Sequence, residues 1–173
     1  EDGGLTGWRY PKDIAGWLSE PEAQALARLA RGKEVVEIGS FCGKSTISMA
    51  QVAKSVDSID WHKGDEMIGN LETLGIFRFN LGKYQLENVR IHVGKTEEIA
   101  PTLPDNSFDV AFVDGGHDEP NVRLDVQHAL RLVRAGGIIA MHDIQLRDVK
   151  LVANEFFADK QSSQIDSMVW FQV

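Results

Sequence analysis

Two short segments carry side chains that could exchange protons or bind a cation. Residues 114–117 read DGGH and residues 142–143 read HD, and each segment follows a short apolar run. Histidine exchanges protons near neutral pH, and carboxylates bind divalent cations through oxygen. Two parallel strands of one sheet end at the same edge, so we expect Asp114, His117 and Asp143 to converge there.

A glycine-containing turn offers a second candidate site. Gly39 and Gly43 lie between an apolar run and a helix-like stretch, and glycine lets the backbone approach a ligand closely. Three residues separate the two glycines, whereas an ATP-binding P-loop has four. The segment 40–42 also lacks the central glycine of a dinucleotide fingerprint. The turn therefore favours a nucleotide-like ligand other than NAD.

An acid follows at the end of the next apolar run. A carboxylate at Asp60 could accept hydrogen bonds from two neighbouring ribose hydroxyls, and it would repel a 2′-phosphate. The plain alternative is that the glycine turn only joins a strand to a helix and that Asp60 is a solvated acid.

The elements that must position these residues alternate along the chain. Ser19 and Glu22 have capping-box spacing before a helix, and Asp118 with Pro120 starts another. Strands are expected at about 34–38, 56–60, 89–93, 108–113, 138–141 and 167–173, and helices at 21–31, 46–53, 71–86, 118–133 and 148–158. This order predicts an α/β fold, a doubly wound, mostly parallel sheet with helices on both faces. Residues 144–173 leave room for one helix and one strand, so we expect the sheet to lack one C-terminal strand.

Composition limits the function classes. The 173 residues, 43% hydrophobic, suit a single domain spanning 1–173, and a net charge of −8 argues against nucleic acid or anionic membranes as partners. The chain shows no apolar run near the roughly 18 residues that span a bilayer and no signal peptide. A single cysteine, Cys42, fits a reducing compartment, so we expect a cytoplasmic location. Unpaired edge strands would make a homo-oligomer a candidate assembly.

The stretch from Val36 to Thr46 resembles the first motif of class I S-adenosylmethionine-dependent methyltransferases. That resemblance implies that Glu37 and the glycine turn hold the methionine part and that Asp60 holds the ribose. It implies, more loosely, that the segment at Lys95 and Thr96 lines the adenine, and Trp61 could flank the adenosine. The expected cofactor contacts are Glu37, Gly39, Ser40, Phe41, Gly43, Ser45, Asp60, Trp61, Lys95, Thr96 and Asp114.

The stretch from Phe108 to Asp143 resembles the branch of that family that methylates hydroxyls of sugars and natural products, including macrocin-type enzymes. The resemblance implies catalytic roles for His117, as general base, and for Asp114. It also implies a divalent metal, Mg²⁺ or another ion, at Asp114 and Asp143. His142 stands where the metal-binding members carry a second acid, and histidine favours softer ions.

The sequence is also compatible with other functions. His117 could be exposed at a helix start, the acceptor could be an amine or a carboxylate, or the chain could be a non-catalytic S-adenosylmethionine-binding or scaffold module. We expect Cys42 to pack in the core. His62, His92 and His128 are interpreted as ordinary surface or helix residues without a partner.

Overall fold

A computed structural model describes residues 4–173 of the protein. Its sheet contains β1 (Glu34–Ile38), β2 (Ser55–Asp60), β3 (Val89–Val93), β4 (Phe108–Val113), β5 (Val133–Met141), β6 (Ser162–Ile165) and β7 (Met168–Gln172). The helices are α1 (Glu20–Ala30), α2 (Lys44–Ala50), α3 (Leu74–Lys83), α4 (Thr96–Ile99), α5 (Glu119–Leu132) and α6 (Arg147–Phe157), with a 3₁₀ turn, η1, at Ala100–Thr102.

The strands form one sheet in the order β3-β2-β1-β4-β5-β7-β6. The first five pair in parallel, and β7 is antiparallel to both of its neighbours, β5 and β6. The order reverses between β1 and β4, which is where ligands bind in doubly wound sheets, beyond the carboxyl ends of the strands. The predicted α/β class is therefore confirmed.

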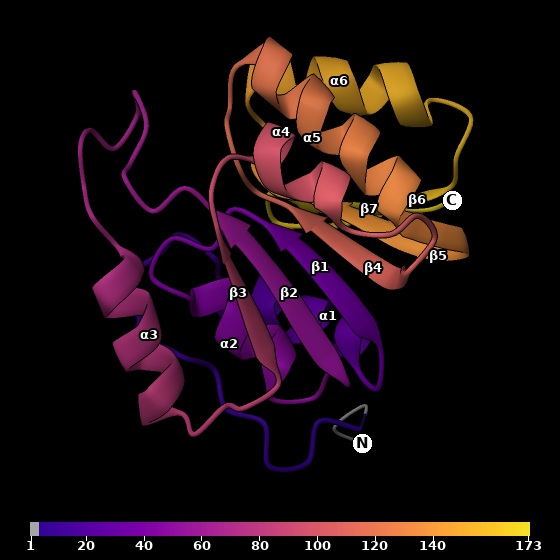
Figure 1. The fold of residues 1–173 in the computed structure, drawn as a ribbon. Helices are drawn as coiled ribbons and strands as arrows, with labels where there is room; N and C mark the ends of the chain where they lie inside the picture. Colours follow the sequence, from indigo (N-terminus) through magenta and orange to yellow (C-terminus); the bar gives the residue numbers. More distant parts are fainter. Residues whose placement is uncertain (1–3) are drawn as a thin grey trace.

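Helices cover both faces of the sheet (Figure 1). On one face, α1 and α2 pack against β1, β2 and β4 through buried aliphatic side chains such as Leu26 and Met49. On the other, α5 and α6 pack through residues such as Val126 and Val152. α3 contacts α2 through Phe77 and Leu81. Both faces of the central strands are buried, which explains their nearly continuous apolar sequences.

The first helix begins as its sequence predicts. The Ser19 hydroxyl accepts a hydrogen bond from the Glu22 backbone N–H at 3.3 Å, and the Glu22 carboxylate accepts one from the Ser19 N–H at 2.9 Å. These reciprocal bonds form the capping box and satisfy two donors that a helix start leaves unpaired.

The C-terminal end of the sheet corrects one expectation. The sequence suggested that one C-terminal strand is absent, but both β6 and β7 are present and form a hairpin. The strand that sequence reasoning missed is β6, whose residues SSQI are polar and mostly exposed at the sheet edge. A polar edge strand has no apolar alternation to reveal it.

The start of β5 also differs from its predicted position. The helix ends at Leu132 and the strand begins at Val133, five residues before the expected start at Ile138. The pairing with β4 is irregular near Phe108, so the glycines 136 and 137, which precede the predicted strand, lie within a distorted part of β5. Within residues 4–173, every helix is too short or too polar to cross a membrane.

Candidate functional site

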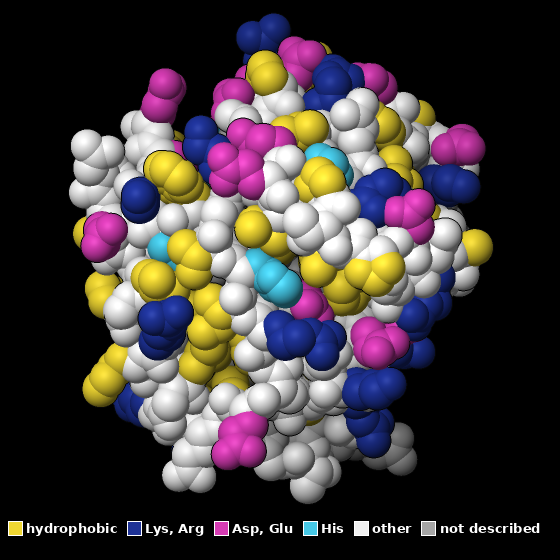
Figure 2. Space-filling view, in the orientation of Figure 1, with side chains coloured by type: hydrophobic (Ala, Val, Ile, Leu, Met, Phe, Trp, Pro, Cys, Tyr) yellow, Lys and Arg dark blue, Asp and Glu magenta, His cyan; other side chains and the backbone are white. Residues whose placement is uncertain are grey.

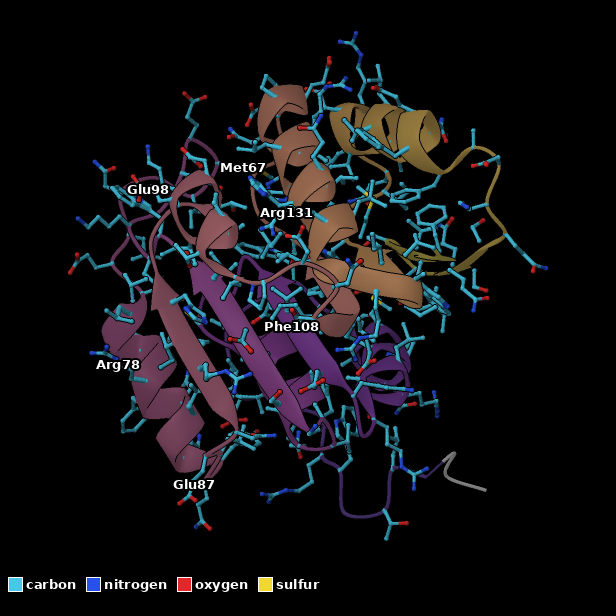
Figure 3. The ribbon with its side chains drawn as sticks, turned by 45° about the vertical axis from the view of Figure 1, so that its right-hand side comes forward. Met67, Arg78, Glu87, Glu98, Phe108 and Arg131 are labelled. Atoms are coloured by element: carbon cyan, nitrogen blue, oxygen red, sulfur yellow. The ribbon has the colours of Figure 1, made fainter. Side chains whose placement is uncertain are left out.

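A cavity of about 500 Å³ opens at the carboxyl edge of the sheet, where its strand order reverses. Figure 3 labels Met67 on the loop beyond this edge and Phe108 at the opposite end of β4. Residues from eight parts of the chain line the cavity: 15–18, 38–41 with 44–45, 59–61 with 64, 65 and 68, 73, 94–97, 114–117, the α5 residues Asn121 and Asp125, and 142–143. Its volume lies in the range of small-molecule sites.

The glycine turn borders this cavity and touches the next loop. Gly39 has a φ of +89°, and a Cβ atom on it would lie 2.1 Å from the backbone oxygen of Asp114. Only glycine permits both this conformation and this approach. The turn after β1 is thus packed directly against the loop after β4.

Asp60 holds the glycine turn in place. Its Oδ2 accepts hydrogen bonds from the backbone N–H groups of Ser40, at 2.8 Å, and Phe41, at 2.9 Å. Its Oδ1 accepts one from the His62 N–H at 2.6 Å. The carboxylate also lines the cavity, so it can contact a ligand while it organises the loop.

Glu37 lies beneath the turn and not in the cavity wall. It is fully buried and accepts hydrogen bonds from the hydroxyls of Ser45, Thr46 and Ser58. Burial raises the pKa of Glu37 to about 7, against the opposing effect of those three bonds. Gly43 also faces inward, toward Phe77. The remaining expected cofactor contacts all line the cavity.

The predicted acid–base residues meet at the rim. His117 Nε2 lies 2.8 Å from Asp143 Oδ2 and 3.9 Å from Asp114 Oδ1. The hydrogen bond with Asp143 raises the pKa of His117 above its usual value, and burial opposes the rise. His117 Nδ1 is the one buried side-chain nitrogen or oxygen in residues 4–173 that has no hydrogen-bond partner.

The pKa values of the Asp114 and Asp143 carboxyl groups are shifted in opposite directions. Burial raises the pKa of Asp114 above its usual value. Burial acts in the same direction on Asp143, but hydrogen bonds from His117 and His142 outweigh it and hold the pKa well below the usual range. Asp143 is therefore the more firmly charged partner of His117.

His142 is anchored from below by the first helix. Its Nε2 lies 3.0 Å from Glu22 Oε2, and its Nδ1 lies 3.3 Å from Asp143 Oδ2. Burial lowers the pKa of His142, but its hydrogen bonds to Asp114, Asp143 and Glu22 raise it to about 12. The same pair leaves the pKa of Glu22 at about 2 in spite of burial. His142 thus brings a positive charge to the position where the family resemblance implies a second acid.

The donor atoms at the rim fit one divalent ion. One ligand atom each from Asp114, His117 and Asp143 lies within 4.8 Å of the others, which ligand bonds of about 2 to 2.5 Å can span. Two oxygens and one nitrogen suit manganese, iron or zinc better than magnesium, which prefers oxygen alone.

Trp61, Lys95 and Thr96 line the same cavity from the segments that follow β2 and β3. The Lys95 ammonium lies 5.2 Å from the centre of the Trp61 ring, and Lys63 lies 4.7 Å from it on the same loop. Such contacts hold the indole, which is 39% exposed, at the cavity edge. Trp17, which sequence reasoning left out, lines the same cavity and contacts the Phe41 ring.

Two histidines correct the sequence interpretation. His62 is buried, with Nδ1 at 2.8 Å from the Thr73 hydroxyl and Nε2 at 3.5 Å from the Ser40 hydroxyl. His92 Nε2 lies 2.8 Å from the buried Asp57 carboxylate. Both have partners that are distant in sequence, which spacing along the chain could not reveal. Cys42 is buried in the α2–α3 cluster, as expected.

Comparisons with known proteins all find similarity to methyltransferases. Residues 36–144 match the model of a family described as a methyltransferase domain. A catechol O-methyltransferase from Niastella koreensis is 31% identical over 132 residues, which cover 75% of this chain and 57% of that protein. The chain thus spans little more than half the length of this curated relative.

Solved structures share the fold. The O-methyltransferase TomG from Streptomyces achromogenes, solved with S-adenosylmethionine, is 23% identical with a TM-score of 0.73, covering 94% of this chain and 82% of that one. The O-methyltransferase NovP is 18% identical with a TM-score of 0.74, covering 87% and 78%.

Proposed function

Because the chain belongs to the methyltransferase-domain family, we propose that it transfers a methyl group from S-adenosylmethionine to a hydroxyl of a small molecule, such as a sugar or another natural product. One observation carries the proposal. A single cavity joins the glycine turn and Asp60 to the pair formed by His117 and Asp143. A ligand site and a proton acceptor thus face the same space.

The cofactor would lie between two walls of the cavity. Carboxylate oxygens offer about four lone-pair positions, and backbone N–H groups occupy three of those on Asp60. The remaining position, on Oδ1, is available to a ribose hydroxyl. Trp61 and Thr96 would contact the adenosine, and the turn at Gly39 to Phe41 the methionine part. Glu37 and Gly43 would act by shaping that turn.

His117 would accept the proton of the acceptor hydroxyl. When its Nε2–H donates to Asp143, the lone pair is on Nδ1, the atom that has no partner. When bound, S-adenosylmethionine would supply the methyl group, and the acceptor oxygen would displace the sulfur from the methyl carbon, with the electrons of the broken carbon–sulfur bond left on the sulfur of S-adenosylhomocysteine. Asp143 and Asp114 stabilise the imidazolium that forms. Alignment of oxygen, methyl and sulfur supplies much of the rate.

A divalent ion would be held by Asp114 and Asp143, with His117 Nε2 as a third ligand only in the tautomer that has its proton on Nδ1, so ligation by His117 and its role as base are alternatives. When bound, such an ion supplies Lewis acidity that lowers the pKa of the acceptor hydroxyl. The positive charge on His142 opposes a second cation nearby, so binding of the ion should be weaker than at an all-carboxylate site.

A calorimetric titration with S-adenosylhomocysteine, run beside ATP and NAD and with or without Mg²⁺ or Mn²⁺, tests the cofactor. We expect binding of S-adenosylhomocysteine alone. If it does not bind, the proposed function is wrong. Binding without turnover on a panel of hydroxylated acceptors, including catechol, would instead favour a non-catalytic module.

His117→Ala tests the proton acceptor. We expect turnover to fall by about 100-fold or more, the usual size of a general-base effect, with S-adenosylhomocysteine affinity nearly unchanged. His128→Ala, on α5 outside the cavity lining, is the control and should keep full turnover. Equal losses of turnover and cofactor affinity in His117→Ala would rule out its role as base.

A further inference from the structure

Asp125 is an acid in the apolar face of α5. It lies between Val122 and Val126, which are buried in the core, and it is itself only 4% exposed. Neither the cofactor contacts nor the proton transfer proposed above uses it, yet it lines the cavity. A carboxyl group in this position therefore needs a separate explanation.

The Asp125 carboxylate contacts two different loops. The Thr96 hydroxyl, at the start of α4, and the Gly116 backbone N–H, in the loop after β4, both favour its charged form. A Cβ atom on Gly115 would lie 2.5 Å from Asp125 Oδ2, so this loop needs glycine to approach the carboxylate so closely. One side chain thus lies against both the adenosine wall and the loop that bears His117.

Packing alone does not account for this acid. Burial, together with the nearby carboxylates of Glu97 and Asp118, raises the pKa of Asp125 to about 7, against the contacts with Thr96 and Gly116. A leucine of similar shape would avoid the cost of burying a carboxylate, since buried polar groups are unfavourable unless they are fully paired. The two loop contacts are what the acid provides and the leucine would not.

We propose that Asp125 is a positioning residue that fixes the loop 94–97 and the loop 114–117 relative to each other. A cofactor that binds against Thr96 then also stabilises the loop that carries His117. The coupling to the cofactor rests on the proposed function. The link between the two loops does not, because its contacts exist without a cofactor.

Amide hydrogen exchange in the ligand-free protein tests the link between the loops. In Asp125→Asn, the amide of Gly116 should exchange about tenfold faster, because the loop then lacks the carboxylate that the Gly116 N–H contacts. Asp125→Leu should show the same loss, even if it unfolds at the same or a higher temperature. The matched control is Asp109→Asn, which removes a carboxylate that accepts the Glu34 N–H at the far end of the sheet. Unchanged Gly116 exchange in both Asp125 variants would overturn the proposal.

A second experiment tests the coupling to the cofactor. We expect Asp125→Asn to bind S-adenosylhomocysteine about tenfold more weakly, and the shift of the His117 ring signal on binding, followed by NMR, to shrink. A wild-type affinity together with a wild-type His117 shift would contradict the coupling. If the wild type itself does not bind S-adenosylhomocysteine, the proposed function fails, while the exchange experiment still decides whether Asp125 links the loops.

Discussion

Asp60 combines a structural and a binding role in one side chain. It accepts three backbone N–H groups from the turn and the next loop while its carboxylate lines the cavity. Asp60→Ala should therefore weaken S-adenosylhomocysteine binding by about 100-fold, which corresponds to the loss of one hydrogen bond to a charged group. Calorimetry measures the affinity. Asp148→Ala removes an acid that accepts the Glu119 N–H away from the cavity, and it should leave that affinity unchanged.

Glu37 gives the protein a pH dependence of stability. Its pKa is about 7 in the folded state and 4.5 in the unfolded chain, so the folded state binds the proton more tightly. This contribution to stability is complete below pH 4.5 and is lost as the pH rises through 7. In Glu37→Gln, the free energy of unfolding measured with urea should fall less between pH 5 and pH 8 than in the wild type. Equal decreases in the two proteins would show that Glu37 is not the titrating group.

The sequence predicts the positions of residues at the ends of strands better than the positions of residues buried beneath loops. The convergence of Asp114, His117 and Asp143 follows from the shared edge of parallel strands. The burial of Glu37 depends on hydroxyls from α2 and β2, and the burial of His62 depends on Thr73. Those neighbours are defined only once the helices are packed. Asp125 left a weak signal, an acid within an apolar helix stripe.

Among the elements, α1 is joined to the end of β5 by the pair of Glu22 and His142. Both side chains are at least 96% buried, and both are charged at neutral pH. His142→Ala leaves Glu22 as a buried charge without a cationic partner, so it should lower the free energy of unfolding by about 3–5 kcal/mol. Urea unfolding of Glu22→Ala, His142→Ala and the double variant measures the coupling. If the two single effects simply add in the double variant, the pair makes no specific contribution.

The alternation of strands and helices was predictable because each apolar run is short and is separated by capping or glycine signals. The capping box at Ser19 and Glu22 is confirmed in detail. β6 and the early start of β5 were not predictable. An edge strand of polar residues and a glycine-containing strand owe their conformation to hydrogen bonds with neighbours, and local sequence does not encode those bonds.

For the whole molecule, the C-terminal hairpin completes the core. β7 pairs with β5 and buries Met168, Val169 and Phe171, and the Phe171 ring stacks on Phe157 of α6 at 4.4 Å. A chain ending at Lys160 would expose the edge of β5 and one side of α6. We expect this truncated chain to lose the cooperative thermal transition seen by circular dichroism. Gln164→Ala, which changes only an exposed β6 residue, is the control. A cooperative transition in the truncated chain would contradict the prediction.

On the face of the molecule shown in Figure 2, acidic and basic side chains are interspersed, so the net charge of −8 forms no single acidic field there. An acceptor that approaches this face would therefore not be steered by one large patch of like charge.

The contacts of the first helix have a consequence for the order of events during protein synthesis. Glu22 Oε1 accepts the backbone N–H of Ser167 at 2.8 Å, and the Ser19 hydroxyl donates to Asp166 Oδ2 at 2.6 Å. These partners are separated by about 145 residues, so they cannot meet until the segment that contains Asp166 and Ser167 has left the ribosome. We therefore expect α1 to reach its final position only after the hairpin of β6 and β7 has been synthesised. Until then, the carboxylate of Glu22 would stay in water.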